Sequence, residues 1–166
     1  MELNKQTYLI LVTAALIWCL LILLPPVLMK AGATGKSISV IDYKFFGHIC
    51  HQFDERSFHI RENKLTVCAR CSGIYFGFLI GVLIIPFFKN IKIRNIKYGL
   101  CLIMLPMVVD VALDFVGIHN SNTLTRALTG LMFGIPSAVL IYPSYEQGIN
   151  QILNRKERIK YYVRKT

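Results

Sequence analysis

Acidic residues are scarce in this chain of 166 residues: nine aspartates and glutamates stand against nineteen lysines and arginines. Charged residues make up only 17%, whereas apolar residues reach 54% and the mean hydropathy is +0.50. A disordered chain has the opposite balance, so this composition excludes one. Five cysteines are too few for a small secreted disulfide scaffold. A soluble nucleic-acid-binding module is excluded as well, because the basic residues flank long uncharged runs instead of covering a polar domain.

Four long apolar runs indicate an integral membrane protein. They cover residues 8–29, 72–88, 98–118 and 127–145. The first has 22 residues, which at about 1.5 Å per residue crosses a hydrocarbon core of about 30 Å. It exceeds the h-region of a signal peptide, so we expect it to remain as an anchor. Because backbone groups must be paired inside lipid, we predict an all-α fold with four transmembrane helices, forming a single membrane domain over residues 1–166.

The basic residues predict how this domain is oriented. An even number of spans puts both termini on one side of the bilayer. That side has a cluster in the short connection after the second helix, made of Lys89, Lys92, Arg94 and Lys97. Six more basic residues lie in the tail of residues 146–166, whereas the 42-residue loop of residues 30–71 mixes both signs. By the positive-inside rule we expect a multi-pass protein of the cytoplasmic membrane, with cytoplasmic termini and an extracytoplasmic loop.

The basic tail has apolar residues at roughly helical spacing, among them Ile149, Ile152 and Ile159. We expect it either to lie on the anionic cytoplasmic leaflet or only to fix the topology.

Glycines form a stripe on each of two predicted helices. Gly73, Gly77 and Gly81 fall at every fourth residue of the second, and Gly130 and Gly134 do the same on the fourth. Small residues at this spacing let helix backbones approach closely in lipid. We therefore predict direct contact between the second and fourth helices. The competing interpretation is a homodimer through one stripe.

Three cysteines and four histidines gather at the predicted outer face. The cysteines are Cys50 and the C-x-x-C pair Cys68 and Cys71, and the histidines are His48, His51, His59 and His119. Three thiolates and one imidazole are a common zinc ligand set, so we predict a zinc site of Cys50, His51, Cys68 and Cys71. His48 or His59 can replace His51, because adjacent residues tend to point apart. The alternatives are a redox or structural disulfide, and idle thiols.

The outer loop gives a structural reason for such a site. It is too polar to enter lipid, and we expect it to be too small to build a core of its own. A metal ion would attach it to the second helix and contribute folding energy, in which case the site is closed and has no part in catalysis.

Polar residues of the last two helices indicate a second site at the same level. Asp110 and Asp114 share one face of the third helix, and carboxylates inside a span usually mark function or pairing. We predict a polar pocket beneath the loop, holding Asp110, Asn122, Arg126, Arg70 and Gln52. Two arginines near helix N-termini suit an anionic group such as a phosphate. In the plainer interpretation, Arg126 only neutralises one aspartate.

The cysteine region resembles a family of small prokaryotic predicted membrane proteins known only as a domain of unknown function. The matching residues read Cys50-His51-Gln52, Arg56-Ser57-Phe58 and Cys68-Ala69-Arg70-Cys71-Ser72-Gly73-Ile74-Tyr75-Phe76-Gly77. The likeness extends more loosely from about Phe46 to Gly134, including Asp110, the Ser121-Asn122 pair, Arg126 and Thr129-Gly130. Where the family pattern has Asp-Gly-x-x-Gln, this chain has Asp110-Val111-Ala112-Leu113-Asp114 and lacks the glutamine. The resemblance implies that Cys50, His51, Cys68 and Cys71 act as one unit, and it implies no activity.

The chain is also similar, more weakly, to the quinone-linked disulfide-bond enzymes of bacterial membranes. These have four helices and a C-x-x-C at the outer start of the second. Their second cysteine pair lies in the next outer loop, where this chain has His119-Asn120-Ser121-Asn122 and no cysteine. That departure places a thiol–disulfide oxidoreductase second among our hypotheses.

Our first hypothesis is a membrane metalloprotein that binds an anionic lipid or isoprenoid phosphate, with the bilayer and no nucleic acid as its partner. If it is an enzyme, Arg70 and Arg126 bind the anion and Asp110 acts as acid or base, with Asn122 beside them among the catalytic candidates. A third hypothesis is a non-enzymatic scaffold or transport component, in which the same residues only hold helices together.

Overall fold

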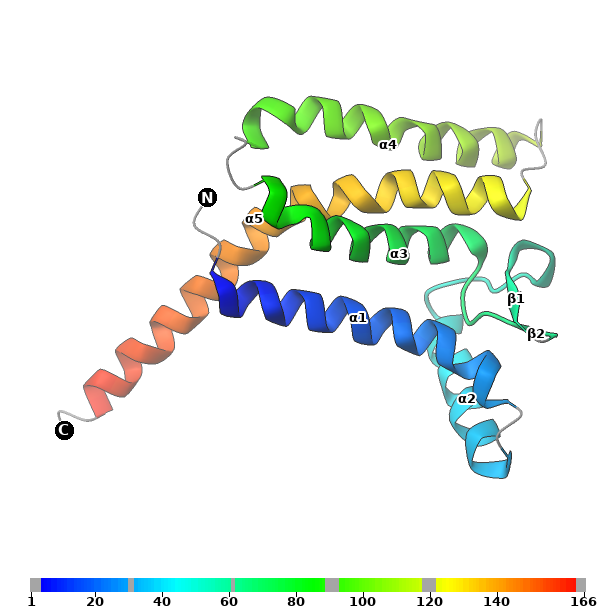
Figure 1. The fold of residues 1–166 in the computed structure, drawn as a ribbon, viewed down its shortest axis with the longest axis horizontal. Coiled ribbons are helices and arrows are strands. Elements are labelled where there is room, and N and C mark those ends of the chain that lie inside the picture. Colours follow the sequence, from blue (N-terminus) through cyan, green and yellow to red (C-terminus); the bar gives the residue numbers. More distant parts are fainter. Residues whose placement is uncertain (1–3, 30–31, 61, 89–92, 118–121, 164–166) are drawn as a thin grey trace.

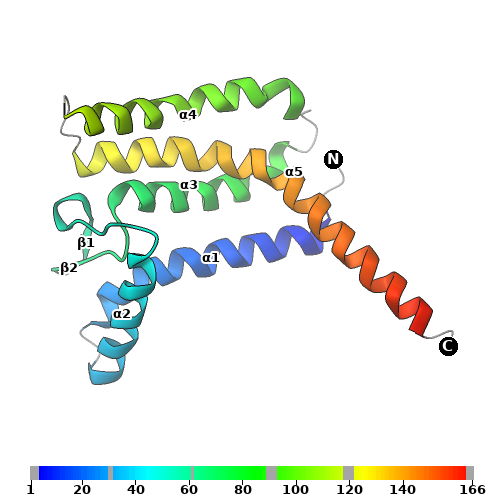
Figure 2. The same ribbon diagram turned by 180° about the vertical axis from the view of Figure 1, so that it is seen from behind.

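A computed structural model describes residues 4–29, 32–60, 62–88, 93–117 and 122–163. Four of its helices are long and apolar enough to cross a membrane, which confirms the predicted fold class. These helices are α1 (Lys5–Leu28), α3 (Ala69–Ile84, extended by the 3₁₀ turn η2, Ile85–Phe88), α4 (Ile93–Val116) and α5 (Thr123–Val163). They lie side by side in the order α1, α3, α5, α4, and both ends of the chain lie at the same end of the bundle (Figures 1 and 2).

The helices extend beyond the apolar runs that predicted them. The largest difference is at α5, which does not end at Tyr145 but continues through the basic tail to Val163. Similarly, α4 begins at Ile93 and not at residue 98, and α3 begins at Ala69 and not at residue 72. A change from apolar to charged residues ends a lipid-crossing segment, but lysine, arginine and glutamate are good helix formers and do not end a helix.

The two glycine stripes pack against each other, as predicted. A Cβ atom at Gly73 would lie 2.1 Å from the carbonyl oxygen of Ala127, and one at Gly134 would lie 2.2 Å from that of Ile74. The backbones of α3 and α5 therefore touch, and larger residues would force them apart. Because both stripes are covered within one chain, a second copy would have to use other surfaces.

The 42-residue loop between the first two membrane helices has more structure than its sequence predicted. It folds into α2 (Gly32–Gly47), the 3₁₀ turn η1 (Asp54–Arg56) and a short antiparallel hairpin of β1 (His59–Ile60) and β2 (Asn63–Lys64). Phe46, Leu65 and Val67 are buried with Ile22 of α1, and Trp18 packs against them. The end of α1 completes this core, which agrees with our expectation that the loop is too small to build a core of its own.

A proline pair explains why the loop docks at this point of α1. Pro26 has no N–H and leaves the carbonyl of Ile22, four residues earlier, without its helical partner. The buried hydroxyl of Thr66 donates to this carbonyl at 3.2 Å, and Ser39 of α2 donates to the carbonyl of Pro25 at 3.0 Å. The loop thus supplies the hydrogen bond that Pro26 removes, as a helix in lipid requires, and Ser39 adds a second bond to a carbonyl that the backbone N–H of Met29 also reaches.

A second cluster holds the opposite end of the bundle together. Val82, Ile85, Ala138 and Tyr142 are buried there. Close by, Glu146 accepts a hydrogen bond of 2.9 Å from the backbone N–H of Asn4, which caps α1. The start of α1 is thereby attached to α5.

Candidate functional site

Three thiols meet where the loop joins α3. Cys50 follows α2, Cys68 caps the N-terminus of α3 and Cys71 lies in the first turn of α3. Their Sγ atoms all lie within 4.8 Å of one another. Sγ of Cys50 also accepts the backbone N–H of Cys68 at 3.2 Å. Hydrogen bonds from the Cys68 and Cys71 thiols lower the pKa of Cys50, which favours its thiolate form.

This arrangement fits a thiophilic metal ion. A zinc ion held tetrahedrally at about 2.3 Å sets its sulfur ligands roughly 3.8 Å apart, a spacing these thiols reach with small rotations. Cys50 is 6% exposed and shares the apolar core of Phe46, Leu65 and Val67. A dry surrounding of this kind protects thiolate–metal bonds from water. The three cysteines are therefore close enough to hold a metal ion.

The histidine of the predicted zinc set lies elsewhere. The ring of His51 stacks on Phe53 with their centroids 5.8 Å apart, and His51 is exposed. Among the described residues no histidine joins the three thiols: His48 bonds to the carbonyl of Lys44 and His59 lies 3.4 Å from Asp54. His119 falls outside the described residues. The structure thus brings together three of the four predicted ligands.

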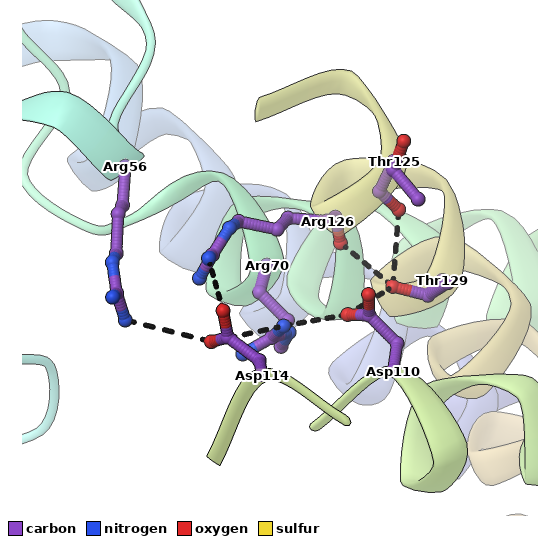
Figure 3. A network of polar contacts seen from close by, with 7 residues as sticks. All are labelled: Arg56, Arg70, Asp110, Asp114, Thr125, Arg126 and Thr129. Atoms are coloured by element: carbon purple, nitrogen blue, oxygen red, sulfur yellow. Dashed lines mark hydrogen bonds and ion pairs between the residues drawn. The ribbon is translucent and has the colours of Figure 1, made fainter. Parts of the chain in front are cut away.

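An ion-pair cluster joins the start of α3 to η1, α4 and α5 (Figure 3). Arg70 contacts Asp110 at 2.5 Å, and Arg126 contacts Asp114 at 2.7 Å. Arg56, from η1 in the loop, lies 3.5 Å from Asp114. Asp110 is 7% exposed and Arg126 is 5% exposed, so most of this charge is buried. The predicted neutralisation of an aspartate by Arg126 is confirmed for Asp114.

Counted over the residues that the structure describes, the cluster has one positive charge in excess and an unused donor. Three of its five charged side chains are arginines and two are aspartates. The Nε–H of Arg70 is buried and has no acceptor among the residues that the structure describes. Thr129 adds a hydroxyl 3.4 Å from Asp110. An excess cation and a free buried donor favour the binding of an anion.

Two residues of the predicted pocket lie outside this cluster. Gln52 donates to the carbonyls of Tyr43 and Thr66 and so belongs to the loop, which makes its predicted place in the pocket wrong. Asn122 precedes α5 and is exposed, and its carbonyl accepts the N–H of Arg126 at 3.0 Å. Arg56 was not predicted as a site residue, although it stands in the motif Arg56-Ser57-Phe58.

The two sites share the first turn of α3. Arg70 stands inside the C-x-x-C pair, directly before Cys71. Because neighbouring helical residues are about 100° apart, Cys71 faces the loop core while Arg70 reaches α4. Arg56 forms a second link, since its guanidinium lies over the ring of Phe53 at 5.4 Å in the loop that carries Cys50. The loop that carries Cys50 thus also contributes an arginine to the ion-pair cluster.

Comparison with known proteins identifies the family. The model of a predicted membrane protein family (DUF2085) matches residues 50–140. The chain belongs to this family. The DUF2085 match includes the three clustered cysteines, the three arginines and both aspartates, so one segment contains both candidate sites.

Two archaeal proteins are similar to the chain. An uncharacterized protein of Methanocaldococcus jannaschii is 39% identical over 147 residues, which cover 85% of this chain and 94% of that protein. An uncharacterized protein of Methanothermobacter thermautotrophicus is 35% identical over 101 residues, or 57% of this chain and 86% of that protein. No solved structure shows a significant match.

Proposed function

We propose that this DUF2085 protein is a membrane metalloprotein in which a zinc ion, bound by Cys50, Cys68 and Cys71, holds the loop against the bundle. The convergence of Cys50 from the loop with Cys68 and Cys71 from the start of α3 is the observation that carries this proposal. Soft thiolates select zinc over magnesium or calcium. A thiolate-rich zinc ion is a weak Lewis acid, so its contribution is structural, and the fourth position is open to a histidine or to water.

The organised site binds the phosphate of an anionic lipid or an isoprenoid. Arg70 and Arg126 bind the phosphate oxygens, and the free Nε–H of Arg70 supports this role. Asp110 is held by Arg70 and accepts a proton during a hydrolysis or transfer step. Arg56, with a side chain 46% exposed, is the arginine that an entering anion reaches first.

The site faces the extracytoplasmic side. Support comes from the sequence, in which basic residues concentrate at positions 89–97 and 155–165. Cysteines introduced at two exposed residues test this: Ser37→Cys on α2 and Gln151→Cys on α5. A membrane-impermeant maleimide applied to intact cells should label the first variant and not the second, with the parent chain as background. The reverse pattern would overturn the orientation.

Elemental analysis of detergent-purified protein tests the metal. We expect about one zinc ion per chain, and all five cysteines should react with a thiol reagent after denaturation without reductant. The variant Cys101→Ala is the matched control, because Cys101 is exposed on α4 and stands apart from the cluster. Cys50→Ala should lose the zinc and Cys101→Ala should retain it. Metal-free protein with only three reactive thiols would contradict the proposal.

The second candidate function is thiol–disulfide exchange, which the same proximity of the three thiols favours. A Cys68–Cys71 disulfide would oxidise a substrate dithiol, with two electrons and two protons passing to the two sulfur atoms, and a membrane quinone would accept them in turn. This function predicts a mixed disulfide that can be trapped in Cys68→Ser or Cys71→Ser. The absence of such an adduct in both variants would exclude it.

A further inference from the structure

An apolar groove between α4 and α5 leads to the ion-pair cluster. Its volume is about 480 Å³, and its walls are mainly leucine and valine side chains of α4, among them Leu102, Leu105 and Val109. Asp110 closes the apolar part together with Thr125 and Thr129 of α5. The groove is therefore hydrocarbon-like along most of its length and polar where it meets the cluster.

The groove opens toward the lipid. Only 6% of the apolar segment of α4 is buried within the chain, so this helix leaves most of its surface to the bilayer. Leu102 and Val109, on the wall of the groove, are 66% and 53% exposed. From Leu102 to Asp110 the wall runs about 12 Å along the helix, at about 1.5 Å per residue. A hydrocarbon chain lying in the membrane can enter here without leaving the lipid.

A carboxylate that lines a lipid-facing groove is energetically unfavourable, and such residues usually have a functional or pairing role. Asp110 pairs with Arg70, which is not part of the groove lining but contacts the Asp110 carboxylate at 2.5 Å. The excess positive charge of the cluster and the unpaired Nε–H of Arg70 therefore lie next to the polar end of the groove, where they complement a negative head group. The apolar wall complements the chain that such a head group carries.

We infer that the α4–α5 groove is the binding site for the hydrocarbon chain of a phosphate-bearing amphiphile. The substrate enters sideways from the bilayer, and its chain lies along Leu102, Leu105 and Val109 while its phosphate reaches Arg70 beside Asp110. This inference rests on the proposed function, and it goes further by assigning the α4–α5 groove to one hydrocarbon chain of the lipid or isoprenoid phosphate.

Two neighbouring valines provide a matched test. Val109 lines the groove, whereas Val108 is 56% exposed, nearly the same as Val109, and does not line it. Val109→Trp should fill the groove and Val108→Trp should point into lipid. The probe is a long-chain alkyl phosphate with a diazirine near the end of its chain, bound to full-length protein in phosphatidylcholine nanodiscs. Cross-linked peptides are identified by mass spectrometry, and thermal stability is measured to verify that both variants fold.

In wild-type protein the probe should label residues around Leu102 and Leu105. Val109→Trp should reduce this labelling by about tenfold, the equivalent of about 1.4 kcal/mol, and Val108→Trp should leave it unchanged. Inorganic phosphate should bind both variants equally. Labelling that is the same in both variants, or that spreads evenly to the lipid-facing residues of α1, would overturn the inference that the groove binds the chain. If inorganic phosphate still bound in that case, the proposed function would stand. Wild-type protein that binds no phosphate and labels no better with the alkyl phosphate than with a neutral alkyl probe would overturn both.

Discussion

Arg70 donates a hydrogen bond of 2.5 Å to Oδ2 of Asp110, and this ion pair joins α3 to α4. Both helices pack mainly on α5, and α4 buries little surface against the rest of the chain. A charge pair at the level of the bilayer therefore fixes how α4 sits on the bundle. The same pair presents Asp110 to the α4–α5 groove, so the placement of the helix and the chemistry of the site depend on one contact.

Removing only one partner of this ion pair should destabilise the protein more than replacing both partners with apolar residues. Arg70→Met leaves Asp110 buried without its main cation, which we expect to cost about 3–5 kcal/mol in the free energy of unfolding. The double variant Arg70→Met with Asp110→Leu should recover most of that loss, because two apolar side chains replace two charges. Unfolding in detergent micelles, followed by circular dichroism, measures the difference.

The control for this prediction is Arg56→Ala. The Arg56 side chain is 46% exposed, so its contact with Asp114 should contribute less than about 1 kcal/mol. A double variant no more stable than Arg70→Met alone would mean that the pair is not the reason for the loss. If the double variant folds well, we expect that it no longer binds inorganic phosphate. This result would show that Arg70 and Asp110 have a binding role besides their contribution to stability.

The glycine contact between α3 and α5 should tolerate no added methyl group. A Cβ atom at Gly77 would lie 2.7 Å from the carbonyl oxygen of Leu131, which is backbone and cannot rotate away. Gly77→Ala should therefore destabilise the protein by about 1–3 kcal/mol through forced separation of the helices. Gly148 of α5 is the control, because a Cβ atom there would have no other atom within 4 Å. Gly148→Ala should be neutral or stabilise the protein by up to about 1 kcal/mol.

Thermal unfolding of these two alanine variants in the same detergent decides the matter. Equal melting temperatures for Gly77→Ala and Gly148→Ala would contradict the close contact. A lower melting temperature for Gly77→Ala alone would establish that α3 and α5 touch through their backbones.

The membrane helices and the glycine contact could be predicted because each depends on a local pattern. Uncharged length identifies a span, and a spacing of four residues identifies a helix face. The loop could not be predicted in this way. Its helix α2 contains Gly32, Gly35 and Ser39, which are weak helix formers, and it is held by burial of Phe46 and by the bond from Ser39 to α1.

The candidate site shows the same division. Cys68 and Cys71 were paired by their spacing, and Cys50 joined them as predicted, but His51 did not. Gln52 has a φ of 50°, a left-handed conformation that turns the chain directly after His51, and His51 stacks on Phe53. The pairing of Arg56 with Asp114 links residues far apart in sequence, and no local pattern carries such a contact.

Thr66 should be needed for docking of the loop on α1. Thr66→Val keeps the shape of the side chain and removes the hydroxyl that donates to the carbonyl of Ile22. The carbonyl then stays buried without a partner, at a cost of about 1–3 kcal/mol. Thr66→Ser keeps the hydroxyl and should lose less, because only a methyl group is removed. Hydrogen exchange of the loop amides measures docking, and equal protection in the two variants would show that the hydroxyl has no part in it.

Removal of the metal should release the loop and leave the bundle intact. Trp18, the single tryptophan of the chain, lies with its ring 5.4 Å from Phe46 and 5.7 Å from Tyr75, so its fluorescence reports the loop core. A chelator should shift Trp18 emission to longer wavelength and expose Cys50, Cys68 and Cys71 to alkylation, while helix content stays constant. Acid should have the same effect, because protons compete with the metal for the thiolates and stability of the site is lost as pH falls.

Added zinc at neutral pH should reverse both changes. Cys101→Ala should respond to the chelator as wild type does, since Cys101 is exposed on α4 and stands apart from the three thiols. Cys68→Ala should show the released loop before any chelator is added. If the chelator left Trp18 emission unchanged in zinc-loaded wild-type protein, the apolar core of Phe46, Leu65 and Val67 would hold the loop without the metal. The three thiols would then need another purpose, and exchange with a disulfide is the chemistry that their spacing still permits.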